Sequence, residues 1–187
     1  MRLALYGGSF DPPHVGHLMA MAYALGVGRV DRLLMVPCLV HRFDKRLVAF
    51  EHRLEMARRC AEPLGALVEV SDVERRIGGE SRTLVTARAL LDQHPGAHLT
   101  VVIGADLVEE RQRWYGYPEL AQLVEFLVVG RAGYPAEADG RLLVPIPDVS
   151  SREVRTRVAT GRSIDGLVPA RVLDYIVAEG LYGGAPA

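Results

Sequence analysis

Short apolar segments alternate with amphipathic segments along most of the sequence, and this alternation is the feature that most restricts the fold. The apolar segments predict strands and the amphipathic segments predict helices. The predicted strands cover residues 2–6, 32–38, 66–74, 98–106, 125–131 and 141–147, and the predicted helices cover 17–25, 50–62, 82–94, 117–124, 150–161 and 168–182. Strands that are apolar nearly throughout are typical of a parallel sheet covered on both faces. We therefore expect an α/β fold with a doubly wound parallel sheet.

The size and charge of the chain set limits on its organisation. A length of 187 residues suits one domain, which we place at 1–182 with a helical C-terminal portion over about 150–182, followed by a flexible tail at 183–187. The formal net charge of −1 gives no general attraction to nucleic acid or anionic lipid. Two cysteines form no disulfide framework, and no apolar stretch suits a membrane span. We expect a cytoplasmic protein, and a homo-oligomer is left open.

The segment "GGSFDPPHVGH" follows the first predicted strand. Ligands of open parallel sheets bind outside the carboxyl ends of the strands, and the helix that begins here offers its N-terminus to phosphate. His14 and His17 are three residues apart, which places both rings on one face of that helix. The alternatives are a metal site, for which two ligands are too few, or capping and surface histidines. The glycine-rich setting between strand and helix favours phosphate binding.

A second candidate anion site lies at "VSSREVR". Ser150 and Ser151 stand at the start of a predicted helix, and Arg155 follows one turn later. Exposed backbone N–H groups, two hydroxyls and a guanidinium could converge there on an anion. When this segment is taken alone, an ordinary capped helix with a surface arginine explains it better than an anion site does.

The two segments together resemble the nucleotidyltransferase superfamily with the (T/H)xGH signature. The signature reads His14-Val15-Gly16-His17, and the SSTxxR motif of the superfamily reads SSREVR over 150–155. Within the superfamily the chain is similar to the bacterial nicotinate-nucleotide adenylyltransferases. The matching segments are "LYGGSFDPPHVGHL", "HRLEM", "VVIGADLVEERQRWYGYPEL", "FLVVGRAGY" and "LVPARVLDYIVAEGLY". The resemblance implies a Rossmann-like fold and an enzyme of NAD biosynthesis that transfers AMP from ATP to nicotinate mononucleotide, giving nicotinate adenine dinucleotide and pyrophosphate.

The resemblance also implies roles for single residues on the ATP side. For the transfer itself we expect a magnesium ion that is held mainly by the triphosphate and water, without assigned protein ligands. The resemblance makes His14, His17 and Arg155 the catalytic groups. The implied ATP contacts are Gly7, Gly8, Ser9 and Phe10 through the backbone, His14 and His17 on the phosphates, Gly104 and Asp106 on the adenosine part or in the adjoining network, and Ser150, Ser151 and Arg155 on the distal phosphates.

The acceptor side departs from the family pattern. The SYTxxT motif of the family reads SRTLVT over 81–86, so Arg82 replaces the tyrosine and either adds a charge or faces solvent. The PPHK loop is altered to "PCLVHRFDK", where either the His41-Arg42 pair or Lys45 supplies the cation for the acceptor phosphate. The implied acceptor contacts are His41, Arg42, Lys45, Arg53, Thr83, Trp114 and Tyr115, with Trp114 stacking on the nicotinate ring.

Other functions remain as alternatives. A related transferase could use a different phosphorylated acceptor, such as nicotinamide mononucleotide, because two of the three departures fall on the acceptor side. The third is Arg152, which replaces the threonine of the SSTxxR motif and adds charge near the triphosphate. A nucleotide-binding regulatory protein without catalysis is disfavoured by the intact His14, His17 and Arg155. A nucleic-acid-binding module is the weakest alternative, because the chain has no basic excess. We therefore expect small-molecule substrates and neither a nucleic acid nor a membrane as partner.

Overall fold

The computed structural model describes residues 1–40, 47–134, 137–138 and 141–183. Its centre is a six-stranded sheet in the order β3-β2-β1-β4-β5-β8, and the described pairings within it are all parallel. The strands are β1 (Arg2–Gly8), β2 (Arg32–Pro37), β3 (Val68–Val70), β4 (His98–Gly104), β5 (Val124–Arg131) and β8 (Pro145–Ile146). The strand order reverses between β1 and β4, which is the arrangement of a Rossmann-like doubly wound sheet. The predicted fold class is confirmed.

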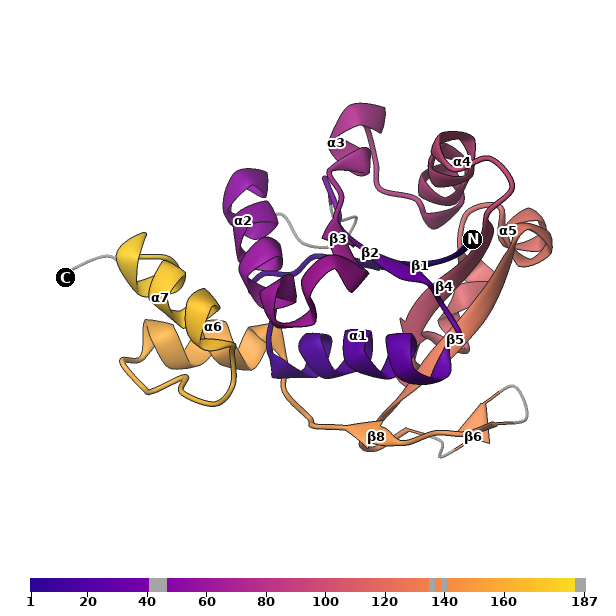
Figure 1. The fold of residues 1–187 in the computed structure, drawn as a ribbon. Coiled ribbons are helices and arrows are strands. Elements are labelled where there is room, and N and C mark those ends of the chain that lie inside the picture. Colours follow the sequence, from indigo (N-terminus) through magenta and orange to yellow (C-terminus); the bar gives the residue numbers. More distant parts are fainter. Residues whose placement is uncertain (41–46, 135–136, 139–140, 184–187) are drawn as a thin grey trace.

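Helices cover both faces of the sheet, which gives the protein three layers (Figure 1). The described helices are α1 (Val15–Val27), α2 (Phe50–Ala61), α3 (Val73–Ile77), α4 (Thr83–Gln93), α5 (Tyr117–Leu123), α6 (Ser151–Ala159) and α7 (Ala170–Ala178). Successive strand residues point to opposite faces, so Ala4 packs with α1, α2 and α7 while Leu3 and Leu5 pack with α4 and α5. Both faces are therefore apolar, as the nearly continuous apolar strands predict.

The prediction of a strand over 66–74 is wrong at both ends. Residues Glu62–Leu67 form a 3₁₀ segment, and β3 pairs with β2 over three residues. The chain then turns into α3, in which Val73 and Glu74 are buried. The physical reason is a buried polar bond, because the Glu74 carboxylate accepts the backbone N–H of Leu39 at 2.9 Å from Oε2. A buried glutamate interrupts the alternation that the apolar residues suggest.

The prediction of one strand over 141–147 is also wrong. The segment holds two short strands, of which β7 (Arg141–Leu142) pairs antiparallel with β6 (Glu137–Ala138) and β8 pairs parallel with β5. The change of partner occurs where the backbone of Val144 passes over Gly130. A Cβ at position 130 would lie 2.6 Å from the Val144 carbonyl oxygen, so this close approach needs glycine.

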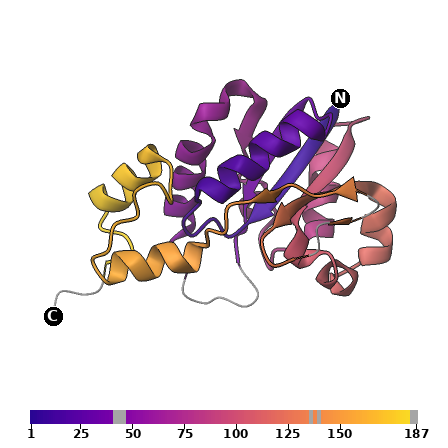
Figure 2. The ribbon, with the colours of Figure 1, turned by 90° about the horizontal axis from the view of Figure 1, so that it is seen from below.

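The helical C-terminal portion lies at one end of the molecule, with α6 close to the turn that precedes α1 (Figures 1 and 2). Val172 and Ile176 of α7 share one core with Met56 and Cys60 of α2. Residues 184–187 of the predicted tail lie outside the described residues. In the described part of the chain, no helix is both long enough and apolar enough to cross a membrane.

The loop before α5 makes a testable contact with α4. Gly116 has φ = 64°, and a Cβ there would collide with the Leu84 side chain. Gly161 has nearly the same φ of 65° with open space around it. We expect Gly116→Ala to lower the free energy of unfolding by about 1–3 kcal/mol more than the control Gly161→Ala, because overpacking adds to the cost of the backbone conformation. Urea unfolding measures the free energy of unfolding of both variants. Equal losses of stability would contradict the close contact between Gly116 and Leu84.

Candidate active site

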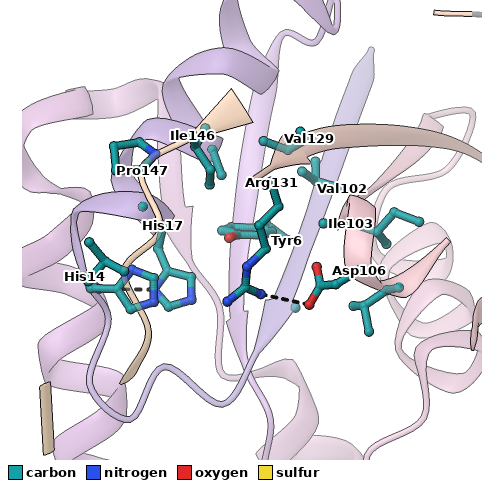
Figure 3. Close-up of a pocket in the computed structure, with 17 residues that line it drawn as sticks. Tyr6, His14, His17, Val102, Ile103, Asp106, Val129, Arg131, Ile146 and Pro147 are labelled. Carbon is teal, nitrogen blue, oxygen red and sulfur yellow. Dashed lines mark hydrogen bonds and ion pairs between the residues drawn. The ribbon is translucent and has the colours of Figure 1, made fainter. Parts of the chain in front are cut away.

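A cavity of about 180 Å³ lies at the carboxyl ends of β1, β4 and β5. Five of the predicted ATP contacts line it, namely Gly7, His14, His17, Gly104 and Asp106. Figure 3 shows the two histidines on one side of the cavity, Asp106 and Ile103 on the other, and Arg131 between them. The cavity therefore occupies the place at which open parallel sheets bind their ligands.

The two histidines of the signature form a stacked pair. Their ring centroids are 3.7 Å apart and the rings are inclined by 30°. The backbone N–H of His14 donates to Nδ1 of His17 at 3.1 Å, which assigns the proton of a neutral His17 ring to Nε2. Nδ1 of His14 is buried and has no hydrogen-bond partner among the described residues. A buried polar atom of this kind is costly unless a ligand satisfies it.

Both rings are neutral at physiological pH in the protein without nucleotide. Burial, followed by the positive charge of Arg131, lowers the pKa of His14 to about 4. Burial also lowers the pKa of His17 well below its usual value, with smaller effects from His14 and Arg131. The histidines can therefore donate hydrogen bonds to a phosphate as neutral imidazoles, without carrying a charge beforehand.

Neighbouring residues fix the orientation of these rings. The Phe10 ring is almost fully buried and meets the His17 ring edge-on, with the centroids 5.0 Å apart. Gly16 approaches His14 so closely that an added Cβ would lie 3.1 Å from its ring. The glycine of the signature thus gives His14 the space it occupies, and the phenylalanine supports His17.

Arg131 is a site residue that the sequence reasoning missed. Its Nη1 donates to Oδ2 of Asp106 at 2.8 Å across the cavity, and both side chains remain partly exposed (Figure 3). The ion pair shows that Asp106 belongs to a polar network at the cavity, and its contact with the adenosine part, direct or through this network, stays a prediction. Arg131 ends β5, so the rule that ligands gather at strand ends was the signal that could have found it.

The second motif lies beside the first but outside the lining of the cavity. Ser150 caps α6 by accepting the Glu153 N–H at 3.1 Å, and the Ser151 hydroxyl donates to the Pro12 carbonyl at 2.8 Å. Nη1 of Arg155 donates to the Asp11 carbonyl at 2.6 Å. The structure thus brings the starts of α1 and α6 together. Contacts of these side chains with phosphate stay predictions, as do backbone contacts of Gly8, Ser9 and Phe10.

The predicted acceptor residues on α4 and its neighbouring loop also lie close together. Trp114 is half-buried against Phe126, and Tyr115 is exposed beside it. The Arg82 guanidinium lies over the Tyr115 ring, 4.2 Å from its centroid, and also pairs with Glu80. Thr83 begins α4 next to Arg82. An aromatic surface, a cation and a helix N-terminus therefore meet on this side.

Arg53 is placed differently from the prediction of an acceptor contact. Its side chain is 2% exposed, and its guanidinium donates to four backbone carbonyls. These carbonyls belong to Ser9, Cys38, Leu39 and Val48. The bonds give Arg53 a structural role between the two sides of the site, and the structure gives no support for direct contact with an acceptor. His41, Arg42 and Lys45 lie outside the described residues.

Two residues of the altered SRTLVT segment serve another buried group. The hydroxyls of Ser81 and Thr86 both donate to the Glu74 carboxylate, which also accepts the Leu39 N–H. Sequence reasoning missed this role of Glu74. Within the described ranges, no three His, Cys, Asp or Glu side chains gather in a way that could hold a metal ion. A magnesium ion held by the triphosphate and water stays a prediction.

Comparison with protein families gives one match over most of the chain. The sequence model of the family described as cytidylyltransferase-like matches residues 5–157. Among curated proteins, a probable nicotinate-nucleotide adenylyltransferase of Anaeromyxobacter dehalogenans (strain 2CP-C) is 40% identical over 185 residues, which is 97% of each chain. A protein of the same name from Myxococcus xanthus is 39% identical and covers 98% of this chain and 95% of its own.

Solved structures support the same fold at lower identity. The Plasmodium falciparum nicotinic acid mononucleotide adenylyltransferase complexed with NaAD has a TM-score of 0.82 at 22% identity, and covers 97% of each chain. The same enzyme complexed with APC has a TM-score of 0.79 at 20% identity, covering 97% of this chain and 96% of its own. At these identities the likeness shows a shared fold.

The lowered histidine pKa values predict a pH dependence of stability. The unfolded chain protonates a histidine near pH 6.5, whereas the pKa of folded His14 is about 4. Between these values the unfolded state binds more protons, so stability is lost as the pH falls. We expect His14→Gln to reduce the slope of this loss by up to about 1.4 kcal/mol per pH unit. Urea unfolding between pH 6.5 and 4.5 measures it, and identical slopes for both proteins would contradict a neutral buried His14.

Proposed function

The chain belongs to the cytidylyltransferase-like family, and we propose that it is an adenylyltransferase that transfers AMP from ATP to nicotinate mononucleotide, releasing pyrophosphate. The observation that carries the proposal is the stacked His14–His17 pair in the cavity at the end of β1, with Nδ1 of His14 buried and unsatisfied by the described residues. The relatives that are about 40% identical over nearly the whole chain support the choice of reaction.

The proposed reaction is a direct in-line transfer. An oxygen of the acceptor phosphate attacks the α-phosphorus of ATP, the bond to the bridging oxygen of the β-phosphate breaks, and pyrophosphate leaves. A phosphate monoester is already ionised near neutral pH, so no strong general base is required. Cys38 and Cys60 are both buried, and burial raises the pKa of both thiols, so neither suits the role of nucleophile. Catalysis then consists of positioning and charge stabilisation.

Neutral histidines suit this chemistry. His17 carries its proton on Nε2, and such a fixed donor stabilises charge that develops on phosphate oxygens without reorganising. The N-terminus of α1 adds backbone N–H groups of the same polarity. Magnesium bound to the triphosphate, as part of the substrate, would offset negative charge on the leaving pyrophosphate.

One contact favours an acidic acceptor over an amide. Arg82, Tyr115 and the start of α4 lie together beside Trp114, and both the guanidinium and the helix N-terminus favour negative charge. A pyridine ring stacked on Trp114 would present its substituent to this region. A carboxylate, as in nicotinate mononucleotide, would gain more there than the carboxamide of nicotinamide mononucleotide.

A panel of acceptors tests the proposed function. The protein is incubated with ATP, magnesium and one acceptor at a time, and the released pyrophosphate is measured. Turnover with nicotinate mononucleotide and much less with nicotinamide mononucleotide is the expected result. If only another phosphorylated acceptor supports turnover, the protein is an adenylyltransferase for that acceptor, and nicotinate mononucleotide is ruled out as its substrate. ATP binding without pyrophosphate release from any acceptor would indicate a nucleotide-binding protein instead.

Substitution of His17 tests the role of the signature. We expect His17→Ala to lower turnover about 10²–10³-fold, because removal of one fixed donor to transition-state charge typically costs this much. His98→Ala is the matched control, since His98 is exposed at the opposite end of the sheet, at the start of β4. A pyrophosphate assay and a thermal melt of each variant separate catalysis from folding. Turnover of His17→Ala close to that of the control would rule out the role.

A further inference from the structure

The turn before α1 is bonded to residues far away in the sequence. The Tyr182 hydroxyl, near the C-terminal end of the described chain, donates to Oδ1 of Asp11 at 2.7 Å. On α6, Arg155 donates to the Asp11 carbonyl at 2.6 Å, and its Nη1 lies 3.7 Å from Oδ2 of the same residue. Asp11 therefore holds one end of the chain and the arginine of the second motif at the same time.

The burial of Asp11 makes these bonds important. Its side chain is 0% exposed, and Oδ2 has no hydrogen-bond partner among the described residues. Burial is the largest effect and raises the pKa of the Asp11 carboxyl above its usual value, and the Tyr182 hydroxyl, the Arg155 charge, the Val48 backbone and the Arg53 charge offset part of this rise. Without the hydroxyl, the carboxyl loses the only side-chain hydrogen bond that the described residues donate to it, so its position beside Arg155 is less well fixed.

The backbone of Tyr182 supports a specific role for its side chain. Tyr182 has φ = 63°, a left-handed conformation that bulky residues seldom adopt and that persists where the surroundings hold it. Its hydroxyl is directed to Asp11, next to the Met56 sulfur. The Arg155 side chain, by contrast, is 30% exposed, so it reaches solvent beyond its bond to Asp11.

We propose that Tyr182 and Asp11 are positioning residues that orient Arg155 toward the distal phosphates of ATP. The inference rests on the proposed function and on the prediction from the sequence that Arg155 contacts these phosphates. Tyr182 touches no substrate; its hydroxyl holds the Asp11 side chain in place, and Asp11 holds one side of the guanidinium. The C-terminal end of the described chain thereby contributes to nucleotide binding at the other end of the sequence.

Binding of ATP and AMP to the complete protein tests the inference. AMP lacks the β- and γ-phosphates, so a defect in Arg155 affects ATP binding and leaves AMP binding unchanged, whereas a general loss of structure affects both. We expect Tyr182→Phe to raise the Kd for ATP with magnesium about three- to tenfold, which is the size of effect expected for the loss of one ordinary hydrogen bond, and to leave the Kd for AMP unchanged. Isothermal titration calorimetry measures both constants.

Tyr175→Phe is the matched control. The Tyr175 hydroxyl also makes a hydrogen bond, to Nδ1 of His52 at 2.9 Å, but it lies outside the contacts of Arg155. We expect this variant to bind ATP and AMP as the unaltered protein does. If Tyr182→Phe and Tyr175→Phe bind ATP equally well, or if Tyr182→Phe weakens ATP and AMP alike, the inference is wrong.

A double substitution tests whether Tyr182 acts through Arg155. In the Arg155→Ala background, Tyr182→Phe should cause no further loss of ATP affinity, and an undiminished additional loss would overturn the inference. Should Tyr182→Phe fail to fold, Asp11→Asn provides the same comparison, since it keeps the shape of the side chain and removes the charge facing Arg155. Asp11→Asn should weaken the binding of ATP and leave the binding of AMP unchanged. An unchanged affinity for ATP would contradict the inference.

These measurements use no acceptor, so they separate the inference from the proposed function. If the unaltered protein does not bind ATP, the proposed function fails. If it binds ATP and the Tyr182 and Asp11 variants bind ATP equally tightly, the proposed function stands and the positioning role fails.

Discussion

The arrangement of the site depends on the interactions of the buried Asp11 carboxyl group with Tyr182 and Arg155. This group lies in the turn that follows β1, and it is reached by a tyrosine from the C-terminal end of the described chain and an arginine from α6. The backbone carbonyl of Pro12, the next residue of the turn, accepts a hydrogen bond from the Ser151 hydroxyl. Sheet pairing fixes β1, and these bonds fix the turn beyond it relative to α6. A fully buried polar group of this kind requires such partners. The turn after β1, α6 and the C-terminal end of the described chain therefore depend on one another for their positions.

The turn leads directly to two histidines whose chemistry follows from their burial. Stacked rings with few polar partners remain neutral, as the lowered pKa values of His14 and His17 require. The proposed anionic ligand would therefore meet fixed N–H donors, helix N-termini and the neighbouring Arg131, rather than charged imidazoles. Keeping polar groups unsatisfied before the ligand binds has a stability cost, which proteins commonly bear at functional sites.

The parallel sheet and the position of the two histidines could be predicted from the sequence, because patterns of neighbouring residues determine both. The apolar strands indicated a parallel sheet, and "GGSFDPPHVGH" placed the histidines at the end of β1. The missed features depend on contacts between distant segments. Tyr182 meets Asp11, Arg131 crosses to Asp106, and Glu74 joins Leu39 to the start of α4, and no local spacing encodes such pairs. The backbone partners of Arg53 were missed for the same reason, since only the folded chain shows which carbonyls surround it.

In the proposed function, the starts of α1 and α6 bind one triphosphate between them. A crystal structure with a non-hydrolysable ATP analogue and magnesium would test this arrangement. We expect phosphate oxygens within hydrogen-bond distance of the His14 and His17 rings and of Arg155, with the nucleoside beside Asp106 and Arg131. A triphosphate bound away from both histidines, or one that meets the histidines while Arg155 points elsewhere, would contradict it.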